Sequence, residues 1–469
     1  YGALYRASFL PHEMSDVNGD YPEFSTGTVK MGNATLSSKG YAVPAYSYLR
    51  KYGDFSMWDI YRAELPLYSL ITPKMSGEMM QSLVQMYKEG GWMPIFPCWN
   101  SYTAAMIGDH AGAALADAYV KGIRNFDAAK AYEGMRLNAF STPYLAKDYR
   151  DGKGRRAIRS YMDNGYIPLE DMVEEAFHTN EQTSRTLEYA YDDYAVAQMA
   201  KALHDSCQDA ALRQKYLEDY NDLMRRSENW RNVINPATGW ADGRYENGKW
   251  ENNEDLVHRK SYITEGATCH YSWYVPQNPE GLFEVIRNSK PMDKREKQIE
   301  KSERKMEKKG ETPVRNEKVI ARLDKMFDNG WYWHGNEPCH QVAYLYDAAG
   351  APEKTQERVH HILQTEYNDT PGGLSGNDDA GQMSAWYVFS SIGFYPVCPG
   401  TPYYYIGTPS FDKVTLNLEN GRKFILSADR QHMDDYLIQS VTLNGKPLGD
   451  YRLSHQQILS GGELHFQMK

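Results

Sequence analysis

Cysteine is scarce in this sequence, and its cysteines lie far apart. The 469 residues contain five of them, with no CxxC pair: Cys98, Cys207, Cys269, Cys339 and Cys398. An odd number at wide spacing argues against a disulfide framework. The sequence also has no HExxH motif, which disfavours a zinc enzyme of the zincin type.

Long apolar runs and clustered basic residues are missing as well. No run approaches the roughly 18 apolar residues of a membrane-spanning helix, and the first residues lack the basic and apolar regions of a signal peptide. Because the chain begins at Tyr1 without methionine, we expect a processed or trimmed piece. The 52 basic and 62 acidic residues give a formal net charge of −10. This balance argues against a nucleic-acid surface, since phosphate binding needs clustered lysine and arginine.

Aromatic side chains, in contrast, are abundant. They make up 13% of the chain, with 37 tyrosines and 10 tryptophans. Most are expected to fill the core, but their flat apolar faces also stack on sugar rings. With 41% apolar residues, a chain of this length can bury a large core. Its length permits two or three domains, or a single large helical barrel.

Two adjacent carboxylates stand in the glycine-bounded loop at the start of residues 376–387. The residues that follow, 383–391, predict a helix that stops at Gly393. Asp378 and Asp379 then lie near the helix N-terminus, where backbone N–H groups and the helix dipole favour ionised acids. That setting suits a base or a metal ligand. The alternative is a helix cap beside a solvated carboxylate.

A second loop, residues 333–340, also gathers polar groups between a glycine and a proline. It precedes residues 342–346, which predict another buried helix. Together the two loops offer carboxylate and carbonyl oxygens. Such ligands suit a hard cation such as calcium better than zinc, which prefers histidine and thiolate.

These two segments resemble the calcium-dependent, exo-acting α-mannosidases of glycoside hydrolase family 92. The run GNDDAGQMSAWYVFSSIGFYPV carries most of the resemblance, and residues 108–111 and 187–193 add to it. The similarity extends from Leu4 to Leu464. The family carries a β-sandwich ahead of its helical domain, and we expect this N-terminal sandwich to be missing from the present sequence.

The resemblance implies a mainly α fold, an (α/α)6 toroid with a small C-terminal β-unit. Apolar spacing predicts helices at 111–121, 184–204, 213–229 and 341–348. From Pro402 onward, 403–406, 414–418 and 423–426 read as short strands, with turns at Asn420-Gly421 and Asn444-Gly445. We therefore predict a catalytic domain at 1–400 and a β-strand unit at 401–469.

By resemblance, Glu265 is the general acid and Asp379 the general base, assisted by Asp378 or Asn377. Water then attacks opposite Glu265 and the anomeric configuration inverts, which requires a carboxylate separation of about 6.5–9.5 Å. A partly apolar setting should raise the pKa of Glu265, while a cation and the helix N-terminus should keep that of Asp379 low. Without the resemblance, Glu265 is an ordinary loop glutamate.

The sequence departs from the family pattern beside Glu265. The family commonly follows the Glu-Gly pair with Asn, a spacer, Trp and Gln, whereas this chain has Ala267, Thr268, Cys269 and His270. Residues 275–278, Val-Pro-Gln-Asn, replace Val-Pro-His-Asp. The preference for linkage or leaving group is therefore open.

The resemblance also implies the ligands of the ion and of the sugar. Calcium is assigned to Asn336 and Glu337, with the O2 and O3 hydroxyls of mannose completing its shell. The predicted substrate-binding residues are Trp58, Asp59, Arg62, Trp99, Asp109, His334 and Asn377. Several have simpler readings, such as a helix cap for Asp109 or an Arg62–Asp59 pair that only supports the fold. His340 is a candidate to orient Glu337. A structural role is favoured for Glu188, Asp192 and Asp193.

Residues 293–318 are dense in charge and look like an insertion into the family pattern. They predict a solvated helix or hairpin with Glu–Lys pairs. A tolerated surface insertion is the favoured interpretation, because a long surface insertion has a modest entropic cost.

The sequence thus predicts a calcium-dependent, inverting exo-α-mannosidase that removes terminal mannose from glycans, in the periplasm or outside the cell. One alternative is a family relative with altered specificity, for a mannosyl-phosphate or another linkage. The other is a catalytically silent protein that binds mannose.

Overall fold

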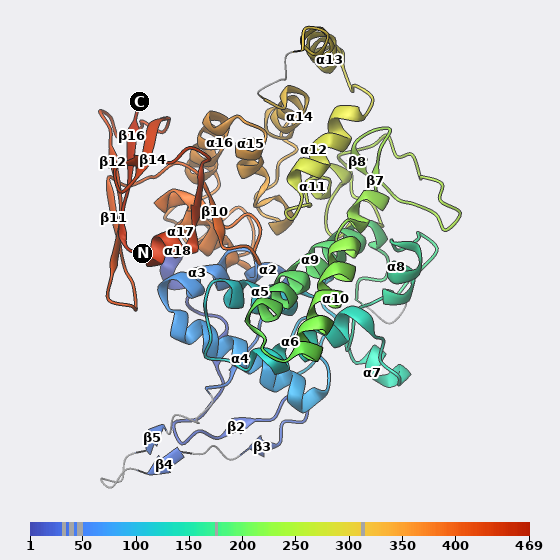
Figure 1. Ribbon diagram of the computed structural model, residues 1–469, viewed down its shortest axis with the longest axis vertical. Helices are drawn as coiled ribbons and strands as arrows, with labels where there is room; N and C mark the ends of the chain where they lie inside the picture. The colour runs from blue at the N-terminus through green and yellow to red at the C-terminus, as the bar shows by residue number, and fades with distance from the viewer. Residues whose placement is uncertain (31–33, 37–41, 45–49, 174–176, 311–314) are drawn as a thin grey trace.

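The computed structural model describes residues 1–30, 34–36, 42–44, 50–173, 177–310 and 315–469. Helices dominate these residues, and small sheets gather at the C-terminal end (Figure 1), so the predicted mainly α class is confirmed. Among the described helices, none has the length and apolar character needed to cross a bilayer.

The longer helices form most of the framework: α4 (Pro73–Gly90), α5 (His110–Val120), α6 (Ala128–Phe140), α9 (Gln182–Ser206), α10 (Ala210–Arg226), α13 (Lys294–Glu307), α14 (Glu317–Asp328), α16 (Pro352–Thr365) and α17 (Gln382–Ile392). Shorter helices connect and cap them: α1 (Gly2–Arg6), α2 (Met57–Ile60), α3 (Glu64–Ile71), α7 (Ala146–Arg150), α8 (Ile158–Asn164), α11 (Thr268–Tyr271), α12 (Pro279–Asn288), α15 (Leu345–Ala348) and α18 (His455–Leu459).

The helices follow one another around a ring. In Figure 1 they run from α3 and α4 (blue) through α5 (teal), α9 and α10 (green) and α12 and α14 (yellow) to α16 and α17 (orange). Helix α9 is buried along most of its length and packs against α5, α6 and α10. Helix α17 contacts α1 and α3, so the two ends of the helical series meet. This arrangement is the predicted (α/α)6 toroid.

The predicted helices agree with the observed ones within a few residues, except at 341–348. There the chain forms a 3-10 turn, η3 (Val342–Tyr344), before α15. Helix α17 ends where predicted, at Gly393, whose φ of 106° is in the left-handed region that favours glycine.

Two sheets occupy the C-terminal part. The larger has the order β11-β12-β16-β13-β14, in which β12 and β16 are parallel, and the smaller has the order β15-β10-β9. Their strands are β9 (Phe394–Tyr395), β10 (Tyr403–Ile406), β11 (Lys413–Asn417), β12 (Lys423–Asp429), β13 (Ile438–Leu443), β14 (Lys446–Pro447), β15 (Arg452–Ser454) and β16 (Gly462–Met468). Apolar residues of these strands share one core with α3, α16 and α17. The domain boundary after residue 400 stays a prediction.

Both predicted turns are present. Gly421 has a φ of 80°, and Asn444 and Gly445 have φ values of 50° and 76°. The last two join β13 to β14 in a two-residue hairpin, for which Asn-Gly is the favoured sequence. Outside the C-terminal sheets, the described residues form further strand pairs: β1 (His12–Glu13) with β6 (Tyr52–Gly53), β2 (Tyr21–Pro22) with β3 (Val29–Lys30), β4 (Ala34–Leu36) with β5 (Ala42–Pro44), and β7 (Ile234–Asn235) with β8 (Trp240–Ala241).

The charged segment 293–318 contains helix α13, which lies at the edge of the molecule (Figure 1), and the first residues of α14. Residues 311–314 of this segment lie outside the described part. One side of this helix is not solvated as predicted. Glu296 is buried and lies 3.3 Å from Arg322 and 3.0 Å from Lys325, both on α14. Helix α13 is therefore held to the toroid by ion pairs.

Candidate functional site

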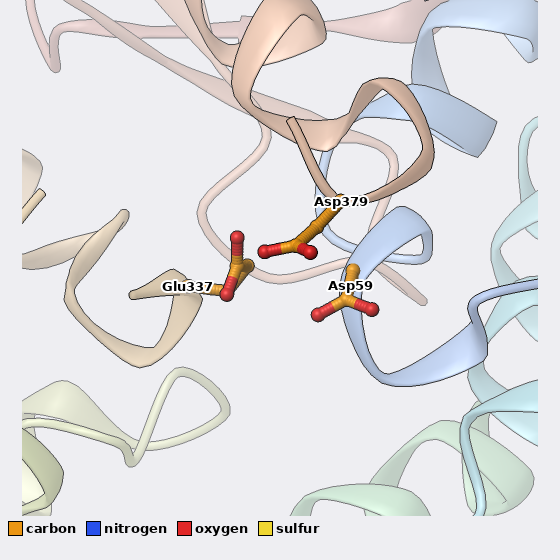
Figure 2. Close-up of side chains that lie close together, drawn as sticks. All are labelled: Asp59, Glu337 and Asp379. Atoms are coloured by element: carbon orange, nitrogen blue, oxygen red, sulfur yellow. The ribbon is translucent and has the colours of Figure 1, made fainter. Parts of the chain in front are cut away.

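Three carboxylates from separate parts of the chain come together (Figure 2). Asp59 lies on α2, Glu337 begins the 3-10 turn η2 (Glu337–Cys339), and Asp379 begins the 3-10 turn η4 (Asp379–Gly381). One oxygen from each lies within 4.8 Å of the others. The side chains of Glu337 and Asp379 point towards each other, with Asp59 beside them. The two loops singled out in the sequence therefore converge, and α2 joins them.

Burial makes this acidic cluster unfavourable without a counter-charge. Glu337 is 1% exposed and Asp59 4% exposed. Burial and the neighbouring carboxylates raise the pKa of both well above the ordinary range. Partial burial also raises the pKa of Asp379; a hydrogen bond with Glu337 lowers it, and the charge of Asp378 raises it again. The protein groups alone therefore do not produce the low pKa predicted for Asp379, which requires a bound cation.

The donor set fits a hard divalent cation. Calcium binds oxygen ligands at about 2.3–2.6 Å, so two ligands of one ion are at most about 5 Å apart. The three carboxylate oxygens meet this limit. Among the described residues, the buried Oε1 of Glu337 has no hydrogen-bond partner. The predicted ligand Asn336, also buried, directly precedes Glu337, and the structure adds Asp59 and Asp379 as candidate ligands.

Asp378 has a different environment from Asp379. Its Oδ1 accepts a hydrogen bond from the backbone N–H of Ser384, and its Oδ2 accepts one from the Ser384 hydroxyl, both at 2.9 Å. Arg6 of α1 lies 3.6 Å away. Asp378 therefore stabilises the first turn of α17, while the carboxylate of Asp379 faces the cluster. Asn377 is exposed beside them.

A glycine contact holds the two loops together. A Cβ atom on Gly376 would lie 2.8 Å from the Cα and the carbonyl oxygen of Gly335, and one on Gly335 would lie 2.8 Å from the carbonyl oxygen of Ser375. These neighbours are backbone atoms, so rotation of a side chain cannot relieve the overlap. Glycine at both positions thus allows the close approach that brings Glu337 to Asp379.

We expect Gly376→Ala to push the loops apart and to destabilise the fold by about 1–3 kcal/mol, as overpacking usually does. The free energy of unfolding in urea measures this loss. Gly372→Ala is the matched control, because its Cβ would meet no atom within 4 Å. Equal effects of the two substitutions would contradict the proposed role of the contact.

Glu265 lies exposed in a turn before α11. Its φ of 52° is in the left-handed region, as is that of Asp379 at 46°. Such backbone strain in residues other than glycine is concentrated at functional sites. Partial desolvation raises the pKa of Glu265; His178 lowers it, and the charge of Asp379 raises it further. The charge of the predicted base thus acts on the predicted acid, and the pKa of Glu265 shifts in the predicted direction.

Trp58 and Arg62 flank Asp59 but face the core. Trp58 is 3% exposed, and its indole N–H donates to Glu188 Oε1 at 3.1 Å. The Arg62 guanidinium packs over the rings of Trp58, Tyr61 and Tyr274, and its Nη2 lies 3.7 Å from Glu188. Arg62 thus pairs with Glu188. Contact of Trp58 or Arg62 with a sugar stays a prediction.

Asp109 belongs to a buried ionic network. Its Oδ1 accepts from Asn138 and its Oδ2 from Arg155, both at 2.9 Å. Burial raises the pKa of Asp109 to about 6, although Arg155 lowers it. His110 binds Glu188 and Asp192 at 2.9 and 2.8 Å. These pairs fit the structural role expected of Glu188 and Asp192, whereas a sugar contact of Asp109 stays a prediction.

His334 and His340 are neutral, buried links between loops. His334 Nδ1 lies 2.7 Å from the Tyr332 hydroxyl and Nε2 lies 2.6 Å from that of Tyr367. His340 donates from Nε2 to the His334 carbonyl at 3.1 Å and accepts from Gln382 at Nδ1. Burial lowers the pKa of both. Both ring nitrogens of His340 are thus engaged away from Glu337, so the expectation that it orients Glu337 is wrong.

Trp99 is the exposed aromatic candidate. Its side chain is 83% exposed, and its backbone N–H donates to Asp54 at 2.6 Å, which fixes a residue with a φ of 53°. An indole face is therefore free for a ligand.

The sequence did not single out Glu64. This carboxyl is fully buried, and neither of its oxygens has a hydrogen-bond partner among the described residues. Burial raises its pKa, and the charges of Asp378 and Asp59 raise it further. Glu64 lies in the first turn of α3, where an acidic residue interacts favourably with the helix dipole and is usually solvated. The sequence therefore contains no signal that this carboxyl is buried.

Solved structures similar to this chain include two mannosidases. A family GH92 alpha-mannosidase from Bacteroides thetaiotaomicron, solved in complex with mannoimidazole, matches with a TM-score of 0.81 and 30% identity, covering 100% of this chain and 55% of that chain. A family GH92 inverting mannosidase from the same organism matches with a TM-score of 0.81 and 31% identity, covering 100% of this chain and 58% of that chain.

A curated relative, described as an uncharacterized secreted glycosidase of Arthroderma benhamiae, is 28% identical over 439 residues, which is 87% of this chain and 50% of the relative. The present chain thus spans about half the length of the relatives it matches. The family model for the catalytic domain of glycosyl hydrolase family 92 matches residues 1–469, and the chain belongs to that family.

Proposed function

We propose that this chain is the catalytic part of a calcium-dependent, inverting exo-α-mannosidase that releases terminal α-linked mannose from glycans in the periplasm or outside the cell. The observation that carries the proposal is the meeting of Asp59, Glu337 and Asp379 in one buried cluster. The charge of Asp379 also raises the pKa of Glu265. Relatives that are an alpha-mannosidase, an inverting mannosidase and a secreted glycosidase support the substrate, the inversion and the secretion.

The two catalytic carboxyls have opposite tasks. Glu265, whose pKa is raised by partial burial and by the charge of Asp379, donates its proton to the glycosidic oxygen as the bond to the anomeric carbon breaks. Asp379, with its carboxylate free of the capping role that Asp378 fills, accepts a proton from the attacking water. The configuration inverts because water and leaving group occupy opposite faces of the sugar.

A calcium ion would be held by Asn336 and Glu337, with oxygens of Asp59 and Asp379 beside it, and it would supply a positive charge that binds the vicinal hydroxyls of mannose and keeps the carboxylates ionised. The chain's own contribution is the rigid placement of these oxygens. Gly335 and Gly376 allow the loops to touch. His334 and His340 fix the backbone on either side of the ligands.

Calcium should stabilise the protein as well as activate it. After treatment with a chelator, we expect loss of mannose release from a synthetic α-mannoside and a lower melting temperature, both restored by calcium. At 100 times the dissociation constant, calcium binding adds about 2.7 kcal/mol to stability. Glu337→Gln should abolish the calcium-dependent shift, whereas the exposed Asp369→Asn should retain it.

Each outcome of this experiment selects one interpretation. Full activity and an unchanged melting temperature in chelator would refute the calcium proposal. Calcium-dependent binding of mannose without release from any α-mannoside would indicate the silent binding protein. Release of mannose from a mannosyl-phosphate but not from mannobioses would indicate the alternative of altered specificity, which was suggested by the departures at Ala267 and Cys269 from the family pattern.

A further inference from the structure

His270 connects the turn of Glu265 to the loop of Glu337. Its Nδ1 accepts a hydrogen bond from the backbone N–H of Ala267 at 3.1 Å, and its Nε2 donates to the Trp331 carbonyl at 2.9 Å. Ala267 is two residues after Glu265. Trp331 lies two residues before the loop 333–340 that carries Glu337. One side chain therefore bridges the two segments that supply the acid and the cation ligands.

This pair of contacts defines the state of the imidazole. An N–H donor faces Nδ1 and a carbonyl faces Nε2, so the ring is neutral with its hydrogen on Nε2. Burial lowers the pKa of His270, which favours the same neutral form. Gly266 makes room for the ring, because a Cβ there would lie 3.0 Å from Nδ1.

The turn needs such a clamp because Glu265 has a left-handed backbone. A strained residue keeps its conformation only when its surroundings fix it. On one side, Ser184 Oγ accepts the Thr264 N–H at 2.9 Å and bonds the Thr264 hydroxyl at 2.8 Å. On the other side, the bond from Ala267 to His270 holds the chain. Glu265 therefore stands between two anchors, one on α9 and one on α11.

We propose that His270 is a positioning residue for the general acid: its two hydrogen bonds hold the strained turn and direct the Glu265 carboxyl towards the glycosidic oxygen. This inference rests on the role proposed for Glu265 and adds the group that sets its geometry. Glutamine is the side chain that can reproduce the arrangement, because its Oε1 accepts an N–H and its Nε2 donates to a carbonyl.

The test compares His270→Leu, which removes both bonds, with His270→Gln, which preserves them. Two substrates are used: an α-mannobiose, whose leaving group needs protonation, and 2,4-dinitrophenyl α-mannoside, whose leaving group does not. We expect His270→Leu to lower kcat on mannobiose by about 10²-fold, the cost of a misplaced catalytic group, with little change on the dinitrophenyl substrate. His270→Gln should restore mannobiose hydrolysis. The control is His258→Leu, an exposed histidine in the same segment.

Equal losses of His270→Leu on the two substrates, or no loss on either, would overturn the proposal, as would failure of His270→Gln to restore a folded enzyme's activity. If His270→Leu does not fold, the proposal is tested by comparing the activity of His270→Gln with that of the native protein. Nitrogen NMR of the native imidazole adds a second test, because hydrogen on Nδ1 would contradict the assigned tautomer. Hydrogen exchange of the Ala267 amide tests the role of His270 independently of the acid assignment. Its protection from hydrogen exchange should fall in His270→Leu even if Glu265→Gln shows that another group is the acid.

Discussion

Glu265→Gln is expected to slow the hydrolysis of an α-mannobiose by about 10²–10⁴-fold, the usual contribution of a general acid. The same substitution should affect 2,4-dinitrophenyl α-mannoside much less, because that leaving group departs without a proton. Initial rates of mannose or dinitrophenol release measure the two effects. Glu254→Gln, which changes an exposed glutamate of the preceding segment, should leave both rates unchanged.

The pH profile gives an independent test of this role. An acid works in its protonated form, so activity should fall as pH rises through the pKa of Glu265. Since desolvation and the charge of Asp379 raise that pKa, the fall should begin above the ordinary range of a glutamate. In Glu265→Gln the alkaline fall should disappear from the residual activity. Equal losses on both substrates, or an unchanged alkaline fall, would assign the acid to another group.

Local structure was predictable from the sequence where one signal acted alone. Apolar spacing and the terminating Gly393 gave helix α17 almost to the residue. The β-branched and aromatic run at β10 gave its strand, and Asn-Gly gave the turn between β13 and β14. Each of these depends on neighbours within a few positions, which is the range over which a single sequence is informative.

Helix α13 shows what the local sequence cannot predict, namely which of its charged side chains are buried. Residues 294–307 have the composition of a solvated helix, and a helix is what they form. The burial of Glu296 depends on Arg322, which stands 26 positions later on another helix. A charge pattern alone cannot show which of its members will meet a partner across the fold.

The candidate site was predicted in part for the same reason. The resemblance identified both loops and named Asp379 as the base, but no local signal distinguishes the environment of Asp378 from that of Asp379. The structure separates the two environments, because Ser384 binds Asp378. The burial of Glu64 and the contact of Gly335 with Gly376 likewise depend on segments that are distant in the sequence. The residues next to Glu64, Gly335 and Gly376 in the sequence do not indicate these arrangements.

Asp379→Asn is expected to lower activity by about 10²–10⁴-fold on both substrates, the mannobiose and the dinitrophenyl mannoside. The reason is that in a single displacement water attacks in the same step for any leaving group. The matched variant is Asp378→Asn, which keeps an acceptor oxygen for the backbone N–H of Ser384 and loses the charge that faces Arg6. It should cost less than about 1 kcal/mol of stability, because asparagine caps a helix about as well as aspartate and a partly exposed ion pair contributes little, with a much smaller loss of rate. Rates at saturating substrate and urea unfolding measure the two effects.

The reverse result, an inactive Asp378→Asn beside an active Asp379→Asn, would exchange the two assignments. Because Asp379 also lies in the acidic cluster, the melting-temperature shift with calcium must be measured on the same variant. A retained shift with lost activity identifies loss of the base, and a lost shift identifies loss of the ion. NMR of the first-formed product then tests the geometry: β-mannose requires a water between carboxylates about 6.5–9.5 Å apart, whereas α-mannose would make Asp379 a nucleophile about 5–5.5 Å from the acid.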